Sequence, residues 1–211
     1  MSFSPRITDA LIAVDIQGDF LPGGSLAVAN GDAIIPVVNS LGQVFGNVVM
    51  TQDWHPANHI SFASNHKGKI PFETVELPYG TQVLWPDHCV WNTEGAQLSP
   101  VLDLPHAQLV IRKGYNGEVD SYSGFREADR TTRTGLDGYL RERGLRRLFV
   151  VGLATDFCVA WTALDAVAAG FETFVIEDAT RPINAAGSLA RAWKDMEDVG
   201  VRRIQSSELL P

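Results

Sequence analysis

Cys158 is placed where a thiol can act as a nucleophile. It follows the apolar segment 147–152, which is predicted as a buried strand, and lies at the start of 157–169, an apolar-periodic segment predicted as a helix. Because the N-terminus of a helix stabilises negative charge, a thiol in its first turn is biased toward thiolate, the reactive form of cysteine. The alternative is a small apolar core residue, the commoner role of a lone cysteine.

An acid and an amine lie at the ends of two other predicted strands. Asp15 closes the strand 10–15, and Lys113 closes the strand 108–113. A cysteine nucleophile needs a base to take its proton, and Asp15 could be that base, while Lys113 suits a cationic role between two anions. Taken singly, Asp15 could be a turn former and Lys113 a solvated side chain. Their joint placement with Cys158 is what predicts a site.

Attack on a carbonyl group also needs hydrogen-bond donors that stabilise the oxyanion. The backbone N–H groups between Ala154 and Cys158 could form such a hole. That arrangement requires an unusual turn, and a cis peptide bond before Ala154 is one way to achieve it. We therefore expect an irregular connection between the strand and the helix at this point.

A second group of residues has the composition of a metal site. Asp53 and His55 follow a predicted strand, His59 comes four residues after His55, and His88 lies in a later loop. One carboxylate and two or three imidazoles suit Zn²⁺, Fe²⁺ or Mn²⁺, with positions left open for water or substrate. The alternative is a set of pocket histidines that are hydrogen-bonded to the backbone.

These residues must be positioned by the elements that they follow. Short apolar segments without strict alternation are separated by helix-period segments, which is typical of a parallel sheet covered on both faces. The fold class is therefore α/β, a three-layer, Rossmann-like sandwich with about six parallel strands and helices on both faces. In such sheets ligands bind beyond the carboxyl ends of the strands. The predicted strands are 10–15, 47–52, 108–113, 147–152, 172–177 and 201–204, and the predicted helices are 31–45, 134–143, 157–169 and 184–198.

Two long segments lack a periodic pattern. Residues 54–107 carry several prolines, and residues 114–133 are polar and rich in glycine. Long irregular segments in a compact domain are usually functional, so we expect both to fold over the strand ends and wall a pocket. The sequence contains no repeat or linker that suggests a second domain, and we expect a single domain over residues 1–211.

Composition limits the partners of the protein. The 211 residues include 17 lysines and arginines against 25 aspartates and glutamates, which gives a net charge of −8 at pH 7. An acidic surface argues against nucleic acid and anionic membranes as partners. No apolar segment approaches the roughly 20 residues that span a bilayer, and residues 1–6 do not resemble a signal peptide. We expect a cytoplasmic protein with reduced cysteines, and we leave the formation of a homo-oligomer open.

Considered together, these residues resemble the nicotinamidase (pyrazinamidase) branch of the isochorismatase-like cysteine hydrolases. The matching segments span nearly the whole chain. They are 14–20 (VDIQGDF), 51–56 (TQDWHP), 85–90 (WPDHCV), 112–114 (RKG), 120–125 (DSYSGF) and 152–159 (GLATDFCV). Several spaced blocks in the right order make the resemblance specific.

The resemblance assigns roles to the residues of the thiol site. Cys158 would be the nucleophile, Asp15 the general base and Lys113 its electrostatic partner. The turn at Leu153–Ala154 would contain a cis peptide bond, with the amides of Ala154 and Cys158 as the oxyanion hole. A six-stranded parallel sheet with flanking helices would carry this site.

The resemblance also implies one divalent metal ion and a pocket for an aromatic amide. Asp53, His55 and His88 would bind the ion, with water completing the coordination. His59 would either bind the metal or orient a ligand or a water. The predicted substrate-binding residues are Phe20, Leu21, Trp85, Tyr115 and Ala154.

The implied reaction is hydrolysis of nicotinamide to nicotinate and ammonia through a cysteine thioester, with pyrazinamide as a further substrate. Another cysteine amidohydrolase of the superfamily, acting on a carbamoyl or ureido compound, would share the thiol site and is the nearest alternative. Isochorismatase activity is disfavoured, because hydrolysis of a vinyl ether would not need Cys158. The non-enzymatic alternative is a metal-binding or redox-sensing protein in which Cys158 is oxidised reversibly.

Overall fold

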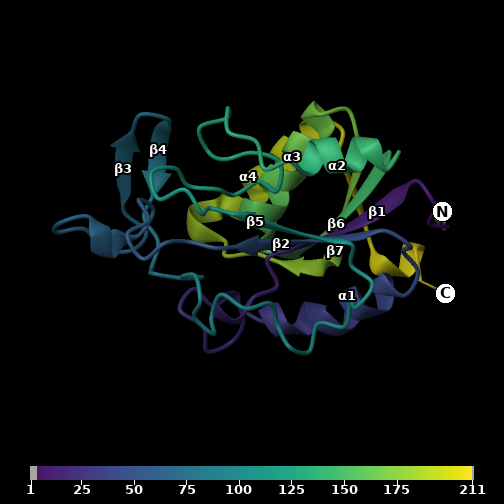
Figure 1. Cartoon of the computed structure of the whole chain (residues 1–211), viewed down its shortest axis with the longest axis horizontal. Coiled ribbons are helices and arrows are strands. Elements are labelled where there is room, and N and C mark those ends of the chain that lie inside the picture. Colours follow the sequence, from purple (N-terminus) through teal and green to yellow (C-terminus); the bar gives the residue numbers. More distant parts are fainter. Residues whose placement is uncertain (1–3, 211) are drawn as a thin grey trace.

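A computed structural model describes residues 4–210, and six parallel strands form its central sheet (Figure 1). The strand order is β5-β2-β1-β6-β7-β8. The chain therefore builds outward from β1 in one direction and then returns to add β6 on the other side. Ligands of open parallel sheets bind where the order reverses in this way, here between β1 and β6. The strands are β1 (Asp9–Val14), β2 (Val48–Asp53), β5 (Leu109–Lys113), β6 (Arg147–Leu153), β7 (Glu172–Arg181) and β8 (Arg202–Ile204).

Helices cover both faces of the sheet. Helix α1 (Ile35–Gly42) lies on one face, and α2 (Leu136–Glu142), α3 (Ala160–Ala168) and α4 (Ser188–Asp198) lie on the other (Figure 1). Alternate residues of β1 enter two separate apolar clusters, one on each face. Because both faces are buried, the strand has an almost continuous apolar sequence. None of the helices within residues 4–210 has both the length and the apolar character needed to cross a lipid bilayer.

The predicted α/β fold is confirmed. All six predicted strands are present with ends shifted by a residue or so, except that β7 continues to Arg181. The four predicted helical segments are also present. The segment predicted as a helix over 157–169 begins earlier than expected, with a turn of π-helix at Thr155–Val159 that leads into α3. Cys158 therefore lies in a wide helical turn and not in the first turn of a regular α-helix.

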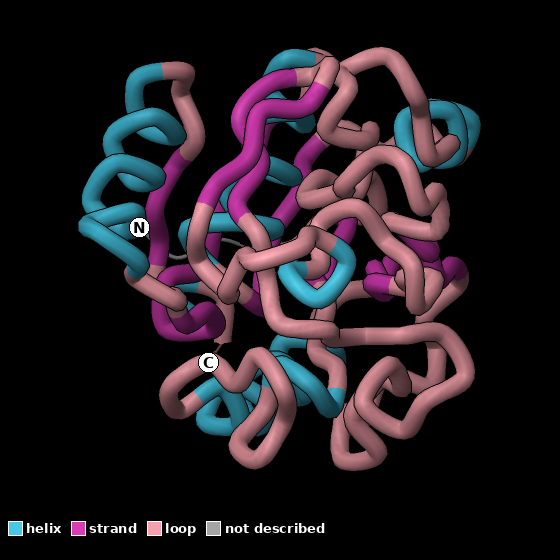
Figure 2. The backbone as a smooth tube through the Cα atoms, turned by 90° about the vertical axis from the view of Figure 1, so that its left-hand side faces the viewer, coloured by secondary structure: helices cyan, strands magenta, loops and turns pink. Residues whose placement is uncertain are grey.

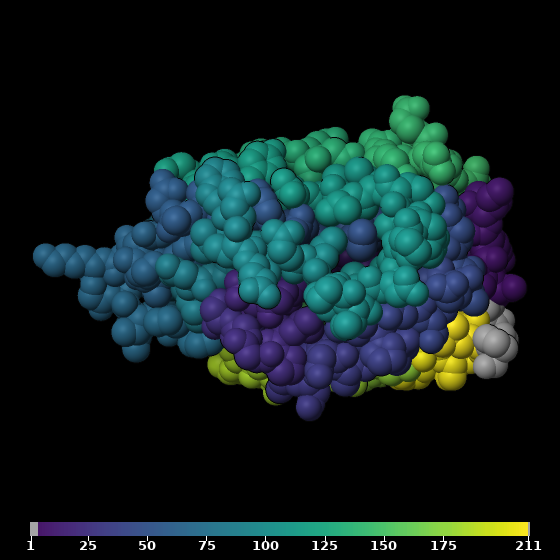
Figure 3. All heavy atoms as spheres, turned by 60° about the horizontal axis from the view of Figure 1, so that its bottom comes forward, coloured from purple at the N-terminus to yellow at the C-terminus, as the bar shows by residue number. Residues whose placement is uncertain are grey.

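A surface hairpin was not predicted. A hairpin of β3 (Thr74–Leu77) and β4 (Gly80–Val83) lies within the segment 54–107, which was expected to be irregular. Most of its side chains are exposed or half-buried. Polar and apolar residues alternate over the four residues of β3, but β4 has no such alternation, so the signal for a strand is short. This part of the chain projects from one end of the molecule (Figure 3).

The long irregular segments gather at the carboxyl ends of the strands. Figure 2 views the molecule from this end, where loops cover most of the surface facing the reader. A glycine allows the two central strands to approach one another here. Gly152 in β6 has a φ of +114°, and a Cβ atom at this position would lie 2.0 Å from the carbonyl oxygen of Val14 in β1. The residues that follow β1 and β6 are consequently held close together.

Candidate active site

Four neighbouring strands each deliver one polar side chain to the same buried place. Across the sheet from β5 to β6, these are Lys113 at the end of β5, Asp53 at the end of β2, Asp15 directly after β1 and Cys158 after β6. Asp15 adopts a left-handed backbone conformation, with φ of 49°, as the chain turns away from the strand. The sequence predicted all four positions, but only the strand order explains why they meet.

Lys113 is the centre of this group. Its Nζ atom lies 2.8 Å from Asp15 Oδ2, 2.5 Å from Asp53 Oδ1 and 3.4 Å from Cys158 Sγ. It also donates a hydrogen bond of 3.0 Å to the carbonyl oxygen of Ser121. The side chains of Lys113 and Asp15 are completely buried. A buried cation that pairs with two carboxylates beside a thiol is arranged to control protons and charge, and not to provide stability alone.

The environment sets the protonation states of these groups. Burial raises the pKa of Asp15, against the opposing effect of the Lys113 ammonium. Burial would lower the pKa of Lys113, but Asp15 and Asp53 outweigh it, so the pKa of Lys113 is raised and the amine remains charged. Asp53 lies between Lys113 and two histidines, and its pKa is lowered despite its burial. The Thr51 hydroxyl donates to Asp15 Oδ1 at 2.6 Å and holds the carboxylate in place.

The thiol differs from the expectation based on the helix N-terminus. Burial raises the pKa of Cys158 well above its ordinary value, and the Lys113 ammonium opposes this only in part. The resting group is therefore a thiol. Desolvation of the charged form is the dominant physical effect, and it comes from residues distant in sequence. A base is then needed for nucleophilic attack. Asp15 and Asp53 both have an oxygen within 4.8 Å of Cys158 Sγ, and Asp15 is the better base because its pKa is raised whereas that of Asp53 is lowered.

The connection between β6 and α3 has the irregular geometry that was expected. The peptide bond between Leu153 and Ala154 is cis. The carbonyl oxygen of Ala154 accepts hydrogen bonds of 3.1 Å from the N–H groups of both Phe157 and Val159, which closes the wide turn. Ala154 and Cys158 both line the adjoining pocket.

Asp53, His55 and His88 form a cluster suited to a metal ion. Asp53 Oδ2 lies 3.6 Å from His55 Nε2 and 4.0 Å from His88 Nε2, and the candidate ligand atoms all lie within 4.8 Å of one another. The Nδ1 atoms of the two histidines lie 2.8 Å from the carbonyl oxygens of Gly114 and Pro86. A carbonyl partner fixes the proton on Nδ1 and leaves Nε2 as the free donor atom. The three residues therefore fit a divalent cation.

Gly114 is required for the position of His55. It has a φ of +69°, and a Cβ atom there would lie 2.3 Å from Cε1 of His55. Gln17 has a similar supporting role, which was not predicted. Its side-chain amide bonds both the N–H and the carbonyl of Asp53, each at 2.8 Å. These contacts fix the backbone from which the carboxylate projects.

His59 lies beside this cluster but faces a different group. Its ring centroid is 4.2 Å from that of His55, and with His55 and Asp120 it forms a second set of close ligand atoms. Both nitrogens have partners, since Nδ1 lies 2.7 Å from Ser61 Oγ and Nε2 lies 3.3 Å from the carbonyl of Val119. Burial lowers the pKa of His59 to about 4, so the ring is neutral.

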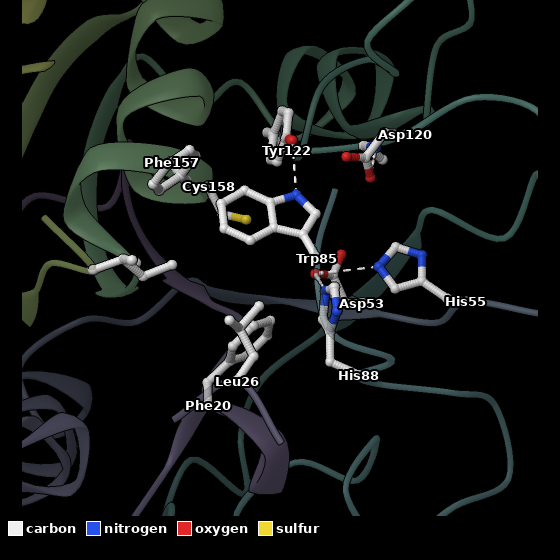
Figure 4. Close-up of a pocket in the computed structure, with 13 residues that line it drawn as sticks. Phe20, Leu26, Asp53, His55, Trp85, His88, Asp120, Tyr122, Phe157 and Cys158 are labelled. Atoms are coloured by element: carbon white, nitrogen blue, oxygen red, sulfur yellow. Dashed lines mark hydrogen bonds and ion pairs between the residues drawn. The ribbon is translucent and has the colours of Figure 1, made fainter. Parts of the chain in front are cut away.

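A pocket connects the thiol with the histidine cluster (Figure 4). Aromatic and aliphatic side chains make up most of its wall, which suits a flat, apolar ligand. The lining residues are Phe20, Leu26, Asp53, His55, Trp85, His88, Asp120, Ser121, Tyr122, Ala154, Phe157, Cys158 and Ile183.

Three of the five predicted substrate-binding residues, Phe20, Trp85 and Ala154, line this pocket. Leu21 and Tyr115 do not line it. Leu21 packs against the apolar core beside its neighbour, and the side chain of Tyr115 is 51% exposed. Because Gly114 turns the chain with a positive φ, the residue after it is directed outward.

Tyr122 occupies the place that was expected for Tyr115. Its hydroxyl oxygen accepts hydrogen bonds from Trp85 Nε1 at 2.9 Å and Gln82 Nε2 at 3.1 Å. Burial raises its pKa well above the ordinary value, so the hydroxyl keeps its proton. Asp120 accepts a hydrogen bond of 2.6 Å from Gln82. The sequence placed Asp120 and Tyr122 in a recognisable segment but gave no role for either side chain.

Comparison with known proteins identifies the family. The sequence model of the family described as the isochorismatase domain matches residues 9–208. The chain belongs to the isochorismatase family. Within this family, a nicotinamidase of Acinetobacter baylyi is 61% identical over 201 residues, which cover 95% of this chain and 94% of that protein.

Solved structures of this family agree with the fold. A nicotinamidase/pyrazinamidase from Acinetobacter baumannii superimposes with a TM-score of 0.96 at 61% identity, covering 97% of this chain and 99% of that one. An enzyme from L. infantum in complex with nicotinate gives 0.87 at 40% identity, covering 100% and 99% of the two chains. A pyrazinamidase of Pyrococcus horikoshii in complex with zinc gives 0.78 at 39% identity, covering 94% and 99%.

Proposed function

We propose that this isochorismatase-family protein hydrolyses nicotinamide to nicotinate and ammonia. The observation that carries the proposal is the buried bridge from Asp15 through Lys113 to Cys158, which opens into an aromatic pocket beside a histidine cluster. The high identity to a nicotinamidase over most of both chains supports the same substrate. Pyrazinamide has the same carboxamide on a similar flat ring, so it is a second substrate of the proposed enzyme.

The first half of the proposed reaction forms a thioester. Asp15 takes the proton of the Cys158 thiol, and the sulfur attacks the carboxamide carbon. Burial raises the pKa of Asp15, which makes its carboxylate a stronger base for this proton transfer. The Lys113 ammonium, 3.4 Å from the sulfur, stabilises the thiolate while it exists. The amides of Ala154 and Cys158 are assigned to the oxyanion.

The second half releases the products. The proton held by Asp15 passes to the amide nitrogen, the C–N bond breaks, and ammonia departs. Asp15, again ionised, takes a proton from a water molecule, which attacks the thioester carbon. The C–S bond breaks, nicotinate is formed, and Cys158 recovers its proton. Lys113 remains charged throughout, because Asp53 stays ionised beside it at 2.5 Å even while Asp15 holds the proton.

Asp53, His55 and His88 are proposed to hold one divalent metal ion, with zinc, iron and manganese all suited to this donor set. When bound, such an ion supplies a Lewis-acidic contact for the ring nitrogen of the substrate and so orients the ring. His59, which has partners for both nitrogens, is assigned a supporting position next to His55 and Asp120. Phe20, Trp85 and the other aromatic residues of the wall would then enclose the ring.

Two broader assignments accompany this function. Residues 1–211 are proposed to form one hydrolase domain, which the family match over residues 9–208 supports. A cytoplasmic location is proposed on the basis of two free cysteines, Cys89 and Cys158, neither of which is in a disulfide.

The test is release of ammonia from nicotinamide by the purified protein. Activity should be lost after treatment with a chelator, return when metal is added, and be absent in the Cys158→Ala variant at every metal concentration. If metal-loaded wild-type protein releases no ammonia from nicotinamide, the proposal is wrong. Carbamoyl and ureido compounds would then be the substrates to examine with the same variant.

A further inference from the structure

Ser121 carries a buried hydroxyl group that neither the fold nor the proposed reaction uses. The residue is 1% exposed, and its side chain oxygen has no hydrogen-bond partner among residues 4–210. Such an oxygen is costly to bury unless something bonds it, so it requires an explanation. Ser121 lines the same pocket as Cys158.

The position of Ser121 is fixed from two sides. Its carbonyl oxygen accepts a hydrogen bond from Lys113 Nζ at 3.0 Å, and the same nitrogen lies 3.4 Å from Cys158 Sγ. Its N–H donates to Asp120 Oδ1 at 2.8 Å. Ser121 is therefore held between the thiol site and the carboxylate near the histidine cluster, with its backbone groups occupied and its hydroxyl free.

The other polar side chains of the pocket wall already have partners. Tyr122 accepts hydrogen bonds from Trp85 and Gln82, and Asp120 accepts them from Gln82 and from the N–H of Ser121. Asp53 is paired with Lys113 and faces the two histidines. A carboxamide that enters this apolar pocket brings two N–H donors, and each needs an acceptor to avoid a desolvation cost. Ser121 Oγ is an acceptor on the wall that is not already bonded.

We propose that Ser121 Oγ accepts a hydrogen bond from the carboxamide nitrogen of the substrate and so makes the site selective for amides. This inference rests on the proposed amidase function. It assigns Ser121 to the binding of the leaving group, whereas the thiol attacks the carbon and the backbone amides bind the oxygen. An analogue with the same ring and carbonyl but no N–H should not depend on this hydroxyl.

The test compares nicotinamide with nicotinaldehyde in the metal-loaded Ser121→Ala variant. The Cys158 sulfur adds to the aldehyde carbon, and the thiol proton passes to the aldehyde oxygen, so this inhibitor probes the same thiol and the same pocket without an N–H donor. Loss of one hydrogen bond should lower kcat/KM for nicotinamide about 10-fold and change the inhibition constant of nicotinaldehyde by less than about 2-fold.

Ser123 provides a matched control on the same loop. Its hydroxyl is also buried, but it accepts a hydrogen bond of 3.0 Å from the N–H of Phe125 and the residue does not line the pocket. Ser123→Ala should therefore weaken nicotinamide turnover and nicotinaldehyde binding by the same factor, through any change in stability, and show no preference for the amide. Ser121→Thr keeps the hydroxyl. It should return the ratio of kcat/KM for nicotinamide to the affinity for nicotinaldehyde to its wild-type value, even if the added methyl group lowers both quantities.

The outcomes separate this inference from the proposed function. If Ser121→Ala weakens nicotinamide turnover (kcat/KM) and nicotinaldehyde binding by the same factor, or changes neither, the hydroxyl does not bind the amide nitrogen and the inference is wrong. Thermal unfolding of each variant shows whether an equal loss comes from instability. If the wild-type protein itself neither releases ammonia from nicotinamide nor binds nicotinaldehyde, the proposed function has failed, independently of Ser121.

Discussion

The most demanding consequence of the site geometry concerns the buried charge of Lys113. Lys113→Met removes the ammonium but keeps a side chain of similar length. The wild-type amine pairs with Asp15 at 2.8 Å and with Asp53 at 2.5 Å. Without it, two buried carboxylates face one another with no cation between them. The variant should lose both stability and activity, and each loss has a separate physical cause.

The magnitude of the stability loss follows from the burial of the group. At an effective dielectric constant of about 20, two unit charges 2.8 Å apart attract by about 6 kcal/mol, although desolvation cancels much of this in the intact pair. Removing one partner of a buried ion pair leaves the other uncompensated and typically costs about 3–5 kcal/mol. We expect the free energy of unfolding of Lys113→Met to fall by this amount at pH 7, as measured by urea denaturation.

The loss should depend on pH in a defined direction. In Lys113→Met, the folded-state pKa of Asp15 and of Asp53 rises, because only the neutral acids tolerate the buried site. A carboxyl group whose pKa is higher in the folded state than its unfolded value near 3.9 stabilises the fold below about pH 3.9. This contribution is lost as the pH rises through the folded-state pKa. The difference between variant and wild type should therefore be smallest near pH 4 and largest at neutral pH.

A surface lysine supplies the control for this prediction. Lys194 pairs with Asp198 across one turn of α4, and both side chains are largely exposed. Lys194→Met should leave the free energy of unfolding nearly unchanged at every pH, because water screens such pairs. The reasoning would be refuted by a Lys113→Met variant with wild-type stability at pH 7, or by a loss that grows as the pH falls.

Further predictions concern the metal cluster, the nucleophile and the behaviour in acid. Gly114→Ala should reduce the metal content of the purified protein, because its Cβ would displace His55, whereas Gly117→Ala meets only ordinary contacts and should retain metal; equal contents in elemental analysis would contradict this. Acid-quenched turnover should leave a substrate-derived acyl group on Cys158 in peptide mass spectra, and an adduct found only at another residue would exclude this nucleophile. The metal-free protein should lose up to about 3 kcal/mol between pH 6.5 and 4, because burial lowers the pKa of His59 to about 4 and the unfolded chain binds the proton first. In His59→Gln, the free energy of unfolding measured by urea denaturation should depend less on pH over this range. An unchanged slope would show that His59 does not titrate in this way.

The elements of the fold could be predicted from the sequence because their signals are local. Each strand of the sheet is a short apolar run that ends at a polar residue or a turn, and this pattern depends only on neighbours along the chain. Asp15, Lys113 and Cys158 were therefore predicted at strand ends. The hairpin of β3 and β4 was not predicted, since it lies at the surface and the alternation of apolar residues in its sequence is confined to the four residues of β3.

The choice between chemically similar residues depended on contacts distant in sequence. Tyr115 and Tyr122 lie on one loop, but the second is held in the pocket by Trp85 and Gln82, which come from another part of the chain. His88 joins Asp53 and His55, and its ring is held at Nδ1 by a carbonyl group, whereas the nearer His59 is bonded at both nitrogens to other groups. How far apart these residues lie in the sequence did not predict which tyrosine lines the pocket or which histidine joins the cluster.

The sequence by itself determined which chemical groups the protein has and at which strand ends they lie. The tertiary structure alone decided the protonation state of these groups. Local reasoning from a helix N-terminus predicted a thiolate at Cys158, but burial by surrounding segments raises its pKa and keeps it a thiol beside Lys113 and Asp15. Desolvation is set by all atoms around a group, and most of these belong to residues that only folding brings near.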